Sequence, residues 1–481
     1  MLLTPHKFQR DAAKFILSTR RCYIGGEMGV GKTIAAVMAI KILKEYEPGA
    51  FPVLVIGPKQ VATIAWPSEL DKWDICEGLR YVTLEGDKYQ RKAKLTRALG
   101  DGTDIFLVNY EQLPWLVDAV GIGSWPFKTV ICDEATKLKA FRTKRGGSHT
   151  RGLDYPVPTR PSAHKSRSQA LARVAAKADR WVCLSGTPAP NGLQDLWGQY
   201  WFLDGGARLG ATFSEFQNAN FAYDGGYKSG RQTLLPGADI RILSQIQDIT
   251  MVIASKDVLD LPPISYVTVS VELSAGVMRQ YKKFAKELKI ALEKEEVAAE
   301  NAASKAVKLL QIANGAVYLS EEDDSETARE WEVLHDDKIA ALREVIAKAD
   351  SPMIVAYHFR SCRERLLAAF PQAKIGSKAN YLAWNAGEIP ILLLHPDSGG
   401  HGLSLQYGGC NIAFFSHWWK WEARAQIIER IGPARQAQSG LHRPVTVYSI
   451  VAEGTVDEVV LQRHVTHAAT HELIKEHLGG L

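Results

Sequence analysis

A glycine-rich turn near the start of the chain constrains the fold more than any other feature. Gly26, Gly31, Lys32 and Thr33 have the G-x-x-x-x-G-K-[ST] spacing of a phosphate-binding loop, followed by a helix-like run from Ile34 to about Lys44. Glycines let backbone N–H groups converge on an anion, and the positive end of the helix dipole points toward it. The spacing predicts a triphosphate site in which Lys32 contacts the β- and γ-phosphates and Thr33 ligates Mg²⁺. The alternative is a glycine turn that binds nothing.

Chain length and composition indicate more than one core. The chain has 481 residues, 46% of them apolar, and this length suits two domains. It contains no run of 18 apolar residues, and its first residues lack the charged and apolar regions of a signal peptide. We therefore expect a cytoplasmic protein with no membrane partner. The six cysteines form no C-x-x-C pair, which favours reduced thiols over disulfides or a zinc site.

Charge is distributed unevenly along the chain. Residues 137–180 contain twelve basic and two acidic residues, a net charge of +10, whereas residues 321–337 contain nine acids and one arginine. This polarity suits a polyanion bound along one face. Within the basic stretch, residues 141–167 are rich in Gly, Ser, Pro and Arg, which predicts a surface loop. Its Arg142, Lys144 and Arg145 could clamp a nucleic acid backbone, or the loop could serve only solubility.

Strand-like apolar runs alternate with helix-length segments in both halves of the chain. This alternation predicts two α/β lobes, each with a mainly parallel sheet covered by helices on both faces. The expected strands of the first lobe are Cys22–Ile24, Val53–Ile56, Ile105–Val108, Val130–Cys132 and Trp181–Leu184, and those of the second are Val267–Val271, Met353–Ala356, Ile391–Leu394, Ile412–Phe415 and Val445–Ile450.

Polar side chains stand where several of these strands end. Asp133 and Glu134 follow a buried strand about a hundred residues after the phosphate loop. Because strand ends beside such a loop present the ligand groups of an α/β sheet, we expect Asp133 to hold Mg²⁺, partly through water, and Glu134 to act as general base. Gln9, on the expected first helix, offers an amide that could recognise adenine. Ser185 and Thr187 follow another strand and could sense the γ-phosphate, or form only a tight turn.

The order of these motifs resembles a superfamily 2 helicase, and specifically its Swi/Snf-like branch, with a compact second lobe similar to short phage- and prophage-encoded members. The resemblance covers most of the chain and rests on residues 26–33, 133–136, 185–188, 196–205, 256–262, 400–406 and 426–430. It implies two tandem RecA-like lobes, residues 1–250 and 251–481, with a helical insertion at about 274–320. It also implies ATP and Mg²⁺ in the cleft between the lobes and double-stranded DNA bound across both.

The same resemblance assigns further residues to roles. Met28 and Gly29 join the nucleotide loop, and Gly402 and Gln426 join Ser185 and Thr187 as coupling residues. In the second lobe Arg430 keeps the family's distance from Gln426, but Pro433 occupies the usual place of a second arginine, so Arg435 is assigned as the finger by proximity. Thr136 stands where the family usually has histidine. The DNA contacts implied by the family motifs or the basic loop are Lys59, Tyr110, Arg142, Lys144, Arg145, His358, Arg360 and Ser398.

Together these features predict a DNA-stimulated ATPase that moves along duplex DNA, which could be forked or branched, as a monomer in a bacterial or phage-infected cell. A strand-separating or branch-migrating helicase is an alternative within the same enzyme class. An ATP-gated DNA-binding or recruitment module is an alternative of another class. The sequence does not identify protein partners.

Overall fold

The computed structural model divides the chain into two compact units. Unit 1 comprises Met1–Val258 and Ala468–Leu481, and unit 2 comprises Leu259–His467. The structure describes residues 2–26, 29–143, 166–224, 231–253, 263–293, 299–319, 330–349, 351–396 and 404–478. The first unit extends beyond the expected boundary at residue 250 because strand β9, Thr250–Ile253, pairs with the strand that leads into the phosphate loop.

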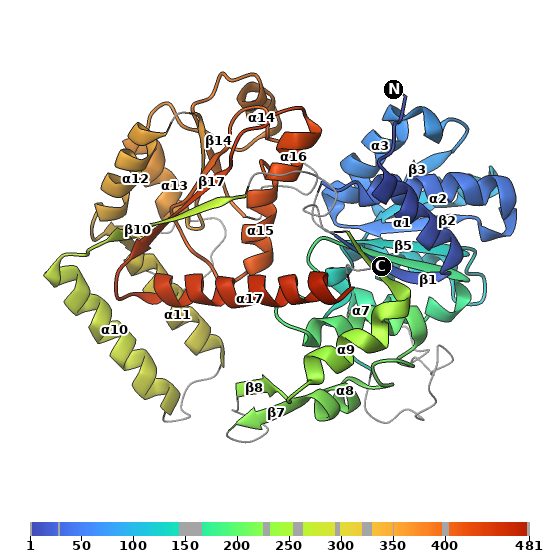
Figure 1. Ribbon diagram of the computed structural model, residues 1–481, viewed down its shortest axis with the longest axis horizontal. Coiled ribbons are helices and arrows are strands. Elements are labelled where there is room, and N and C mark those ends of the chain that lie inside the picture. Colours follow the sequence, from blue (N-terminus) through green and yellow to red (C-terminus); the bar gives the residue numbers. More distant parts are fainter. Residues whose placement is uncertain are drawn as a thin grey trace. The chain divides into compact units, whose positions relative to one another are not determined.

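Unit 1 contains a seven-stranded sheet in the order β3-β4-β2-β5-β6-β1-β9. Figure 1 labels β1, β2, β3 and β5 of this sheet. Every pairing in this sheet is parallel. The strands are β1 Arg21–Gly26, β2 Val53–Gly57, β3 Tyr81–Thr83, β4 Ile105–Asn109, β5 Thr129–Asp133, β6 Arg180–Ser185 and β9 Thr250–Ile253. A second, two-stranded antiparallel sheet joins β7 Phe221–Asp224 to β8 Arg231–Leu234.

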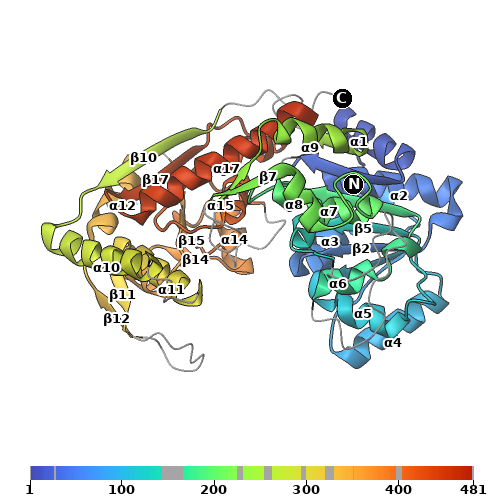
Figure 2. The same cartoon turned by 90° about the horizontal axis from the view of Figure 1, so that it is seen from below.

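Both faces of the large sheet in unit 1 are covered by helices, because alternate residues of its buried strands are apolar on both sides. Val53 and Val55 of β2 belong to one core cluster, and Leu54 and Ile56 to the other. The first cluster is completed by α1 Lys7–Ser18, α2 Lys32–Tyr46 and α3 Trp66–Lys72. The second is completed by α4 Lys88–Gly100, α5 Leu113–Val120, α6 Arg167–Ala172, α7 Gln194–Asp204, α8 Phe213–Asn220 and α9 Ala238–Ile246, of which α4, α5 and α6 form a group at one end of the unit (Figure 2).

Unit 2 contains a six-stranded sheet in the order β10-β17-β16-β13-β15-β14, again with parallel pairings. Its strands are β10 Ser265–Val271, β13 Met353–Ala356, β14 Lys374–Ile375, β15 Ile391–Leu394, β16 Asn411–Phe414 and β17 Thr446–Ala452. The small strands β11 Ala316–Tyr318 and β12 Trp331–Val333 form a separate two-stranded antiparallel sheet.

Helices also cover both faces of the sheet in unit 2. One core cluster takes in residues of α10 Ala275–Glu293, α11 Ala299–Ala313, α12 Asp337–Lys348, α13 Arg360–Ala369 and the start of α17 Val456–Leu478. The other takes in α14 Lys378–Asn385 and α15 Trp421–Glu429, and the short α16 is Pro433–Gln438. Helices α10 and α11 run side by side and form the expected helical insertion (Figures 1 and 2).

The last helix, α17, ends within unit 1. Its residues Ile474 and Leu478 are buried in a core cluster of that unit. Among the residues that the structure describes, no helix is both long and apolar enough to span a membrane.

Candidate nucleotide site and acidic turn

The phosphate loop of unit 1 connects β1 to α2 through two glycines with left-handed backbone conformations. Gly29 has φ 84° and Gly31 has φ 80°, and Gly31 is the N-cap residue of α2. Such angles are readily adopted only by glycine. A Cβ atom on Gly26 would lie 2.9 Å from the Ile253 carbonyl oxygen of β9, so that position is also restricted to glycine. The Lys32 Nζ atom donates to the Gly26 carbonyl oxygen at 2.8 Å, which places the amine at the mouth of the loop.

Gln9 lies directly against this loop. Its Nε2 atom donates to the Val30 carbonyl oxygen at 3.3 Å, and its Oε1 atom accepts from the His6 backbone N–H at 2.9 Å. A Cβ atom on Gly31 would lie only 2.2 Å from Gln9 Nε2. The amide predicted to recognise adenine therefore also braces the phosphate loop.

Asp133 and Glu134 form an acidic turn at the end of β5, and both side chains are buried. The Asp133 Oδ1 atom accepts from the Glu134 backbone N–H at 3.0 Å. Burial raises the pKa of Asp133, while hydrogen bonding from Trp66 and the positive charge of Lys32 act in the opposite direction. Glu134 has φ 53°, and it is the only non-glycine residue with a positive φ in the part of the chain that the structure describes. A strained backbone of this kind is often found at functional sites.

Two aromatic side chains hold this turn, and sequence reasoning gave neither of them that role. The Trp66 indole N–H donates to Asp133 Oδ2 at 2.8 Å, and the Tyr110 hydroxyl donates to the Asp133 carbonyl oxygen at 3.0 Å. Both side chains are fully buried. The expectation that Tyr110 contacts DNA therefore needs correction, because its side chain faces the acidic turn and not solvent.

Ser185 and Thr187 lie at the end of β6, the strand next to β5, and both are buried. The Ser185 Oγ atom accepts from the Thr187 backbone N–H at 3.1 Å, as in a local turn. The pair therefore lies at the same sheet edge as the acidic turn, because the carboxyl ends of parallel neighbouring strands meet there. Their predicted role in sensing the γ-phosphate remains a prediction.

The residues expected to contact DNA have different surroundings. Lys59, after β2, and Arg360, the first residue of α13, are exposed, whereas His358 is partly buried and stacks against His395 and Trp418. Arg142 packs over the Phe213 ring at 3.4 Å and donates to the Lys139 and Phe141 carbonyl oxygens. Arg142 is therefore part of the packing of unit 1, and burial lowers its pKa.

The proposed arginines of unit 2 lie in a segment that is hydrogen-bonded to Ser404 and Leu405. The Leu405 N–H donates to the Arg430 carbonyl oxygen at 3.1 Å, and Arg435 Nη1 donates to Ser404 Oγ at 2.8 Å. Arg430 is buried, Gln426 is half-buried, and burial lowers the pKa of Arg435.

Gln436 and Arg443 complete this arrangement and were not singled out from the sequence. Gln436 Nε2 donates to the Gly409 and Ile431 carbonyl oxygens at 3.0 and 3.1 Å, and its Oε1 atom accepts from Arg443. No spacing motif identifies either residue, and the contact of Gln436 with Gly409 joins positions 27 residues apart.

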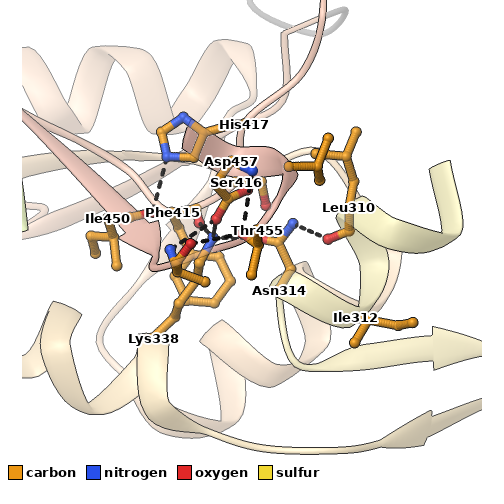
Figure 3. Close-up of polar contacts among 12 residues, drawn as sticks. Leu310, Ile312, Asn314, Lys338, Phe415, Ser416, His417, Ile450, Thr455 and Asp457 are labelled. Atoms are coloured by element: carbon orange, nitrogen blue, oxygen red, sulfur yellow. Dashed lines mark hydrogen bonds and ion pairs between the residues drawn. The ribbon is translucent and has the colours of Figure 1, made fainter. Parts of the chain in front are cut away.

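Unit 2 also contains a fully buried ion pair between Lys338 of α12 and Asp457 of α17 (Figure 3). Lys338 Nζ also donates to Asn314 Oδ1 at 3.2 Å, at the end of α11, and Asp457 Oδ2 accepts from the Ala452 backbone N–H at 3.1 Å. Nearby, the His417 ring bonds the Ile450 carbonyl oxygen, and burial lowers the pKa of His417 to about 3, so the ring is neutral. The network joins the helical insertion to the sheet and to α17.

Five of the predicted site residues lie outside the described residues: Met28, Lys144, Arg145, Ser398 and Gly402. The same is true of most of the basic loop and of the acidic run at 321–329.

The residues of unit 1 fit a nucleotide with Mg²⁺. Among the described residues there is no cluster of three or more His, Cys, Asp or Glu side chains at metal-binding distances. Mg²⁺ is usually held by one or two protein oxygens together with substrate phosphates and water. The Thr33 hydroxyl at the start of α2 and the Asp133 carboxylate at the end of β5 would supply such oxygens.

Comparisons with known proteins identify related sequences. The family described as the SNF2-related domain matches residues 8–149. Protein p41 of Acyrthosiphon pisum secondary endosymbiont phage 1 is 40% identical over 479 residues, which cover 98% of each chain. The chromodomain-helicase-DNA-binding protein 1-like of Danio rerio is 26% identical over 218 residues, which are 44% of this chain and only 18% of that protein.

Among solved structures, the Hef helicase domain of Pyrococcus furiosus is similar in fold. Its TM-score is 0.52 at 14% identity, and the match covers 95% of this chain and 97% of that chain. With the two parallel sheets described above, this likeness confirms the expected fold class of two tandem RecA-like lobes.

Proposed function

Because the chain belongs to the Swi/Snf-like branch of helicase superfamily 2 and is an ATP-hydrolysing enzyme of that branch, we propose that it is a DNA-stimulated ATPase that moves along duplex DNA. The observation that carries this proposal is the convergence of loop and acidic turn in unit 1. Lys32 lies at the mouth of the glycine loop and is close enough to Asp133 to influence its pKa.

Each residue of this site has a proposed role. Lys32 and the backbone N–H groups of the loop bind the phosphates, and Thr33 and Asp133 hold Mg²⁺, which would supply charge neutralisation at the phosphates when bound. Glu134 orients and deprotonates the attacking water. Arg430 and Arg435 stabilise the charge that develops on the γ-phosphate, and Ser185, Thr187 and Gln426 relay its loss.

The proposal also includes that DNA is the nucleic acid that stimulates ATP hydrolysis. It is supported by the SNF2-related family match, by the printed name of the Danio rerio relative, which is a helicase and DNA-binding protein, and by the exposed basic residues Lys59 and Arg360 at strand ends. Contacts of this type grip phosphates without reading sequence.

Steady-state ATPase measurements test the proposal. Turnover should rise at least tenfold with duplex DNA and should rise less with single-stranded DNA or RNA. Glu134→Gln should retain ATP binding and lose turnover by at least 100-fold, as expected for loss of a general base. Wild-type turnover that is unaffected by any nucleic acid would refute the DNA part of the proposal, and normal turnover by Glu134→Gln would refute the assigned base.

Two displacement assays then distinguish movement from strand separation. A translocase displaces the third strand of a triplex, whereas a helicase also separates the strands of a forked or four-way duplex. Triplex displacement without duplex unwinding is the expected result. An enzyme that displaces neither, and hydrolyses ATP more slowly than about one per second with DNA, would instead be an ATP-gated binding module.

A further inference from the structure

Two segments of unit 1 combine an exposed tip with one buried aromatic side chain. They follow β2 and β4, which are neighbours in the sheet, and β2 is in turn the neighbour of β5. The first segment exposes Lys59 and Ile64, and the second exposes Glu111. In each segment the polar group of a buried aromatic side chain, the Trp66 indole N–H or the Tyr110 hydroxyl, donates a hydrogen bond to the acidic turn at the end of β5.

Trp66 connects the first segment to the Asp133 carboxylate. The helix after β2 contains a π-helical turn, Val61–Ala65, that continues into α3, and the Trp66 backbone N–H donates to the Val61 carbonyl oxygen. Pro67 explains this turn, because it has no N–H and its ring crowds the carbonyl group four residues earlier. The widened turn sets where Trp66 points, and its indole N–H reaches Asp133 Oδ2 at 2.8 Å.

Tyr110 connects the second segment to the backbone of the same turn. It begins a single 3-10 turn, Tyr110–Gln112, and its hydroxyl lies 3.0 Å from the Asp133 carbonyl oxygen and 3.4 Å from that of Glu134. The next residue, Glu111, is exposed and pairs with Arg167 at 2.7 Å. A movement of the exposed part of this segment would therefore also move the hydroxyl that supports Asp133 and Glu134.

We propose that Trp66 and Tyr110 are positioning residues that couple duplex DNA, bound at Lys59 after β2 and at Arg167 beside the segment after β4, to the orientation of the Asp133-Glu134 turn. This inference rests on the proposed function and assigns the route by which DNA stimulates hydrolysis. The left-handed backbone of Glu134 makes the turn sensitive to its supports, because a non-glycine residue holds such a conformation only where its surroundings impose it.

Two conservative substitutions and one matched control test the coupling. Trp66→Phe and Tyr110→Phe remove one donor each and keep the aromatic ring. Trp125→Phe is the control, because Trp125 is also a buried tryptophan of unit 1 and its Nε1 atom has no hydrogen-bond partner within the described structure. Each variant is assayed for DNA affinity, for ATP turnover without DNA and for turnover at saturating DNA.

We expect the ratio of stimulated to basal turnover to fall at least fivefold in Trp66→Phe and Tyr110→Phe, with DNA affinity within twofold of wild type. Trp125→Phe should keep the wild-type ratio. A second readout needs no turnover: amide hydrogen exchange of residues 129–138 should slow when duplex DNA binds nucleotide-free wild type, and this slowing should be lost in the two variants.

The results separate this inference from the proposed function. If wild type is stimulated by DNA and both variants keep the full ratio and the exchange response, the coupling route is wrong while the proposed function stands. If basal and stimulated turnover fall in parallel, the two aromatics only support the fold, which also overturns the inference. If wild type shows no stimulation by any DNA, the proposed function fails first.

Discussion

Replacing Lys338 with methionine should destabilise unit 2 strongly. Lys338 and Asp457 are both fully buried, and the lysine also bonds Asn314 of the helical insertion. Methionine fills a similar volume but carries no charge, so the variant leaves the Asp457 carboxylate buried without its cation. Removing one partner of a buried ion pair costs about 3–5 kcal/mol, far more than the net contribution of an intact pair.

That loss converts to a measurable shift in unfolding temperature. For a domain of 150–250 residues, 1 kcal/mol corresponds to about 2–4 °C, so the transition of unit 2 should move down by about 6–20 °C. Scanning calorimetry of the full chain measures the shift as the displacement of one transition while the other stays in place. The double variant Lys338→Met/Asp457→Asn should recover at least half of the loss, because the amide is neutral and its oxygen can still accept from Ala452 N–H.

Lys348→Met is the matched control on the same helix. Lys348 lies 3.9 Å from Glu344, with side chains 79% and 76% exposed, and pairs of this kind contribute about 0.5 kcal/mol or less. A shift for Lys338→Met no larger than that of the control would refute the reasoning that the buried carboxylate depends on its cation. A double variant as unstable as the single variant would refute the assignment of the cost to the unpaired charge.

Three further predictions follow from the site and the core. Lys32→Ala should weaken ATP binding by about 10–100-fold in calorimetric titration, the loss expected for one charged hydrogen bond. Gly31→Ala should destabilise unit 1 by at least about 1–2 kcal/mol in urea unfolding and weaken ATP binding, because its φ is 80° and its Cβ would meet Gln9, whereas Gly49→Ala, with open space around it, should do neither. Burial lowers the pKa of His417 to about 3, so as pH falls the unfolded chain takes up a proton at this histidine before the folded chain does. The contribution of the neutral ring to the free energy of unfolding is therefore fully present above about pH 6.5 and is lost as pH falls below that value. The free energy of unfolding should decline less steeply over this range in His417→Gln.

The central strands could be predicted from the sequence because each is a continuous apolar run that is buried on both faces. Val53–Gly57 and Ile391–Leu394 are examples, and every residue in both is buried. Two of the edge strands, β3 and β14, could not be predicted in the same way. Tyr81–Thr83 is three residues long and half-buried, and Lys374–Ile375 has two residues, so neither carries a pattern that distinguishes it from a loop.

In the candidate site, too, features set by local sequence could be predicted, whereas contacts between residues far apart in the sequence could not. The phosphate loop is visible because its glycines and lysine are required at fixed spacing within eight residues. Trp66 lies 67 positions from Asp133, and Lys338 lies 119 positions from Asp457, so no spacing indicates either contact. The resemblance to the family implies that Tyr110 contacts DNA, and only the folded sheet shows that its side chain faces β5.

Two buried aspartates show why the acidic turn is held by aromatic donors. In unit 2, Lys338 cancels the charge of Asp457, and the pair serves as an anchor between helices. In unit 1, Asp133 receives neutral donors, the Trp66 indole and the Glu134 amide, one on each oxygen. A neutral hydrogen bond contributes only about 1 kcal/mol, but it orients a carboxylate without neutralising it. An arginine at position 66 would hold Asp133 more firmly and would compete with Mg²⁺ for its charge, so Trp66→Arg should impair Mg²⁺-dependent ATP binding more than Trp66→Phe does.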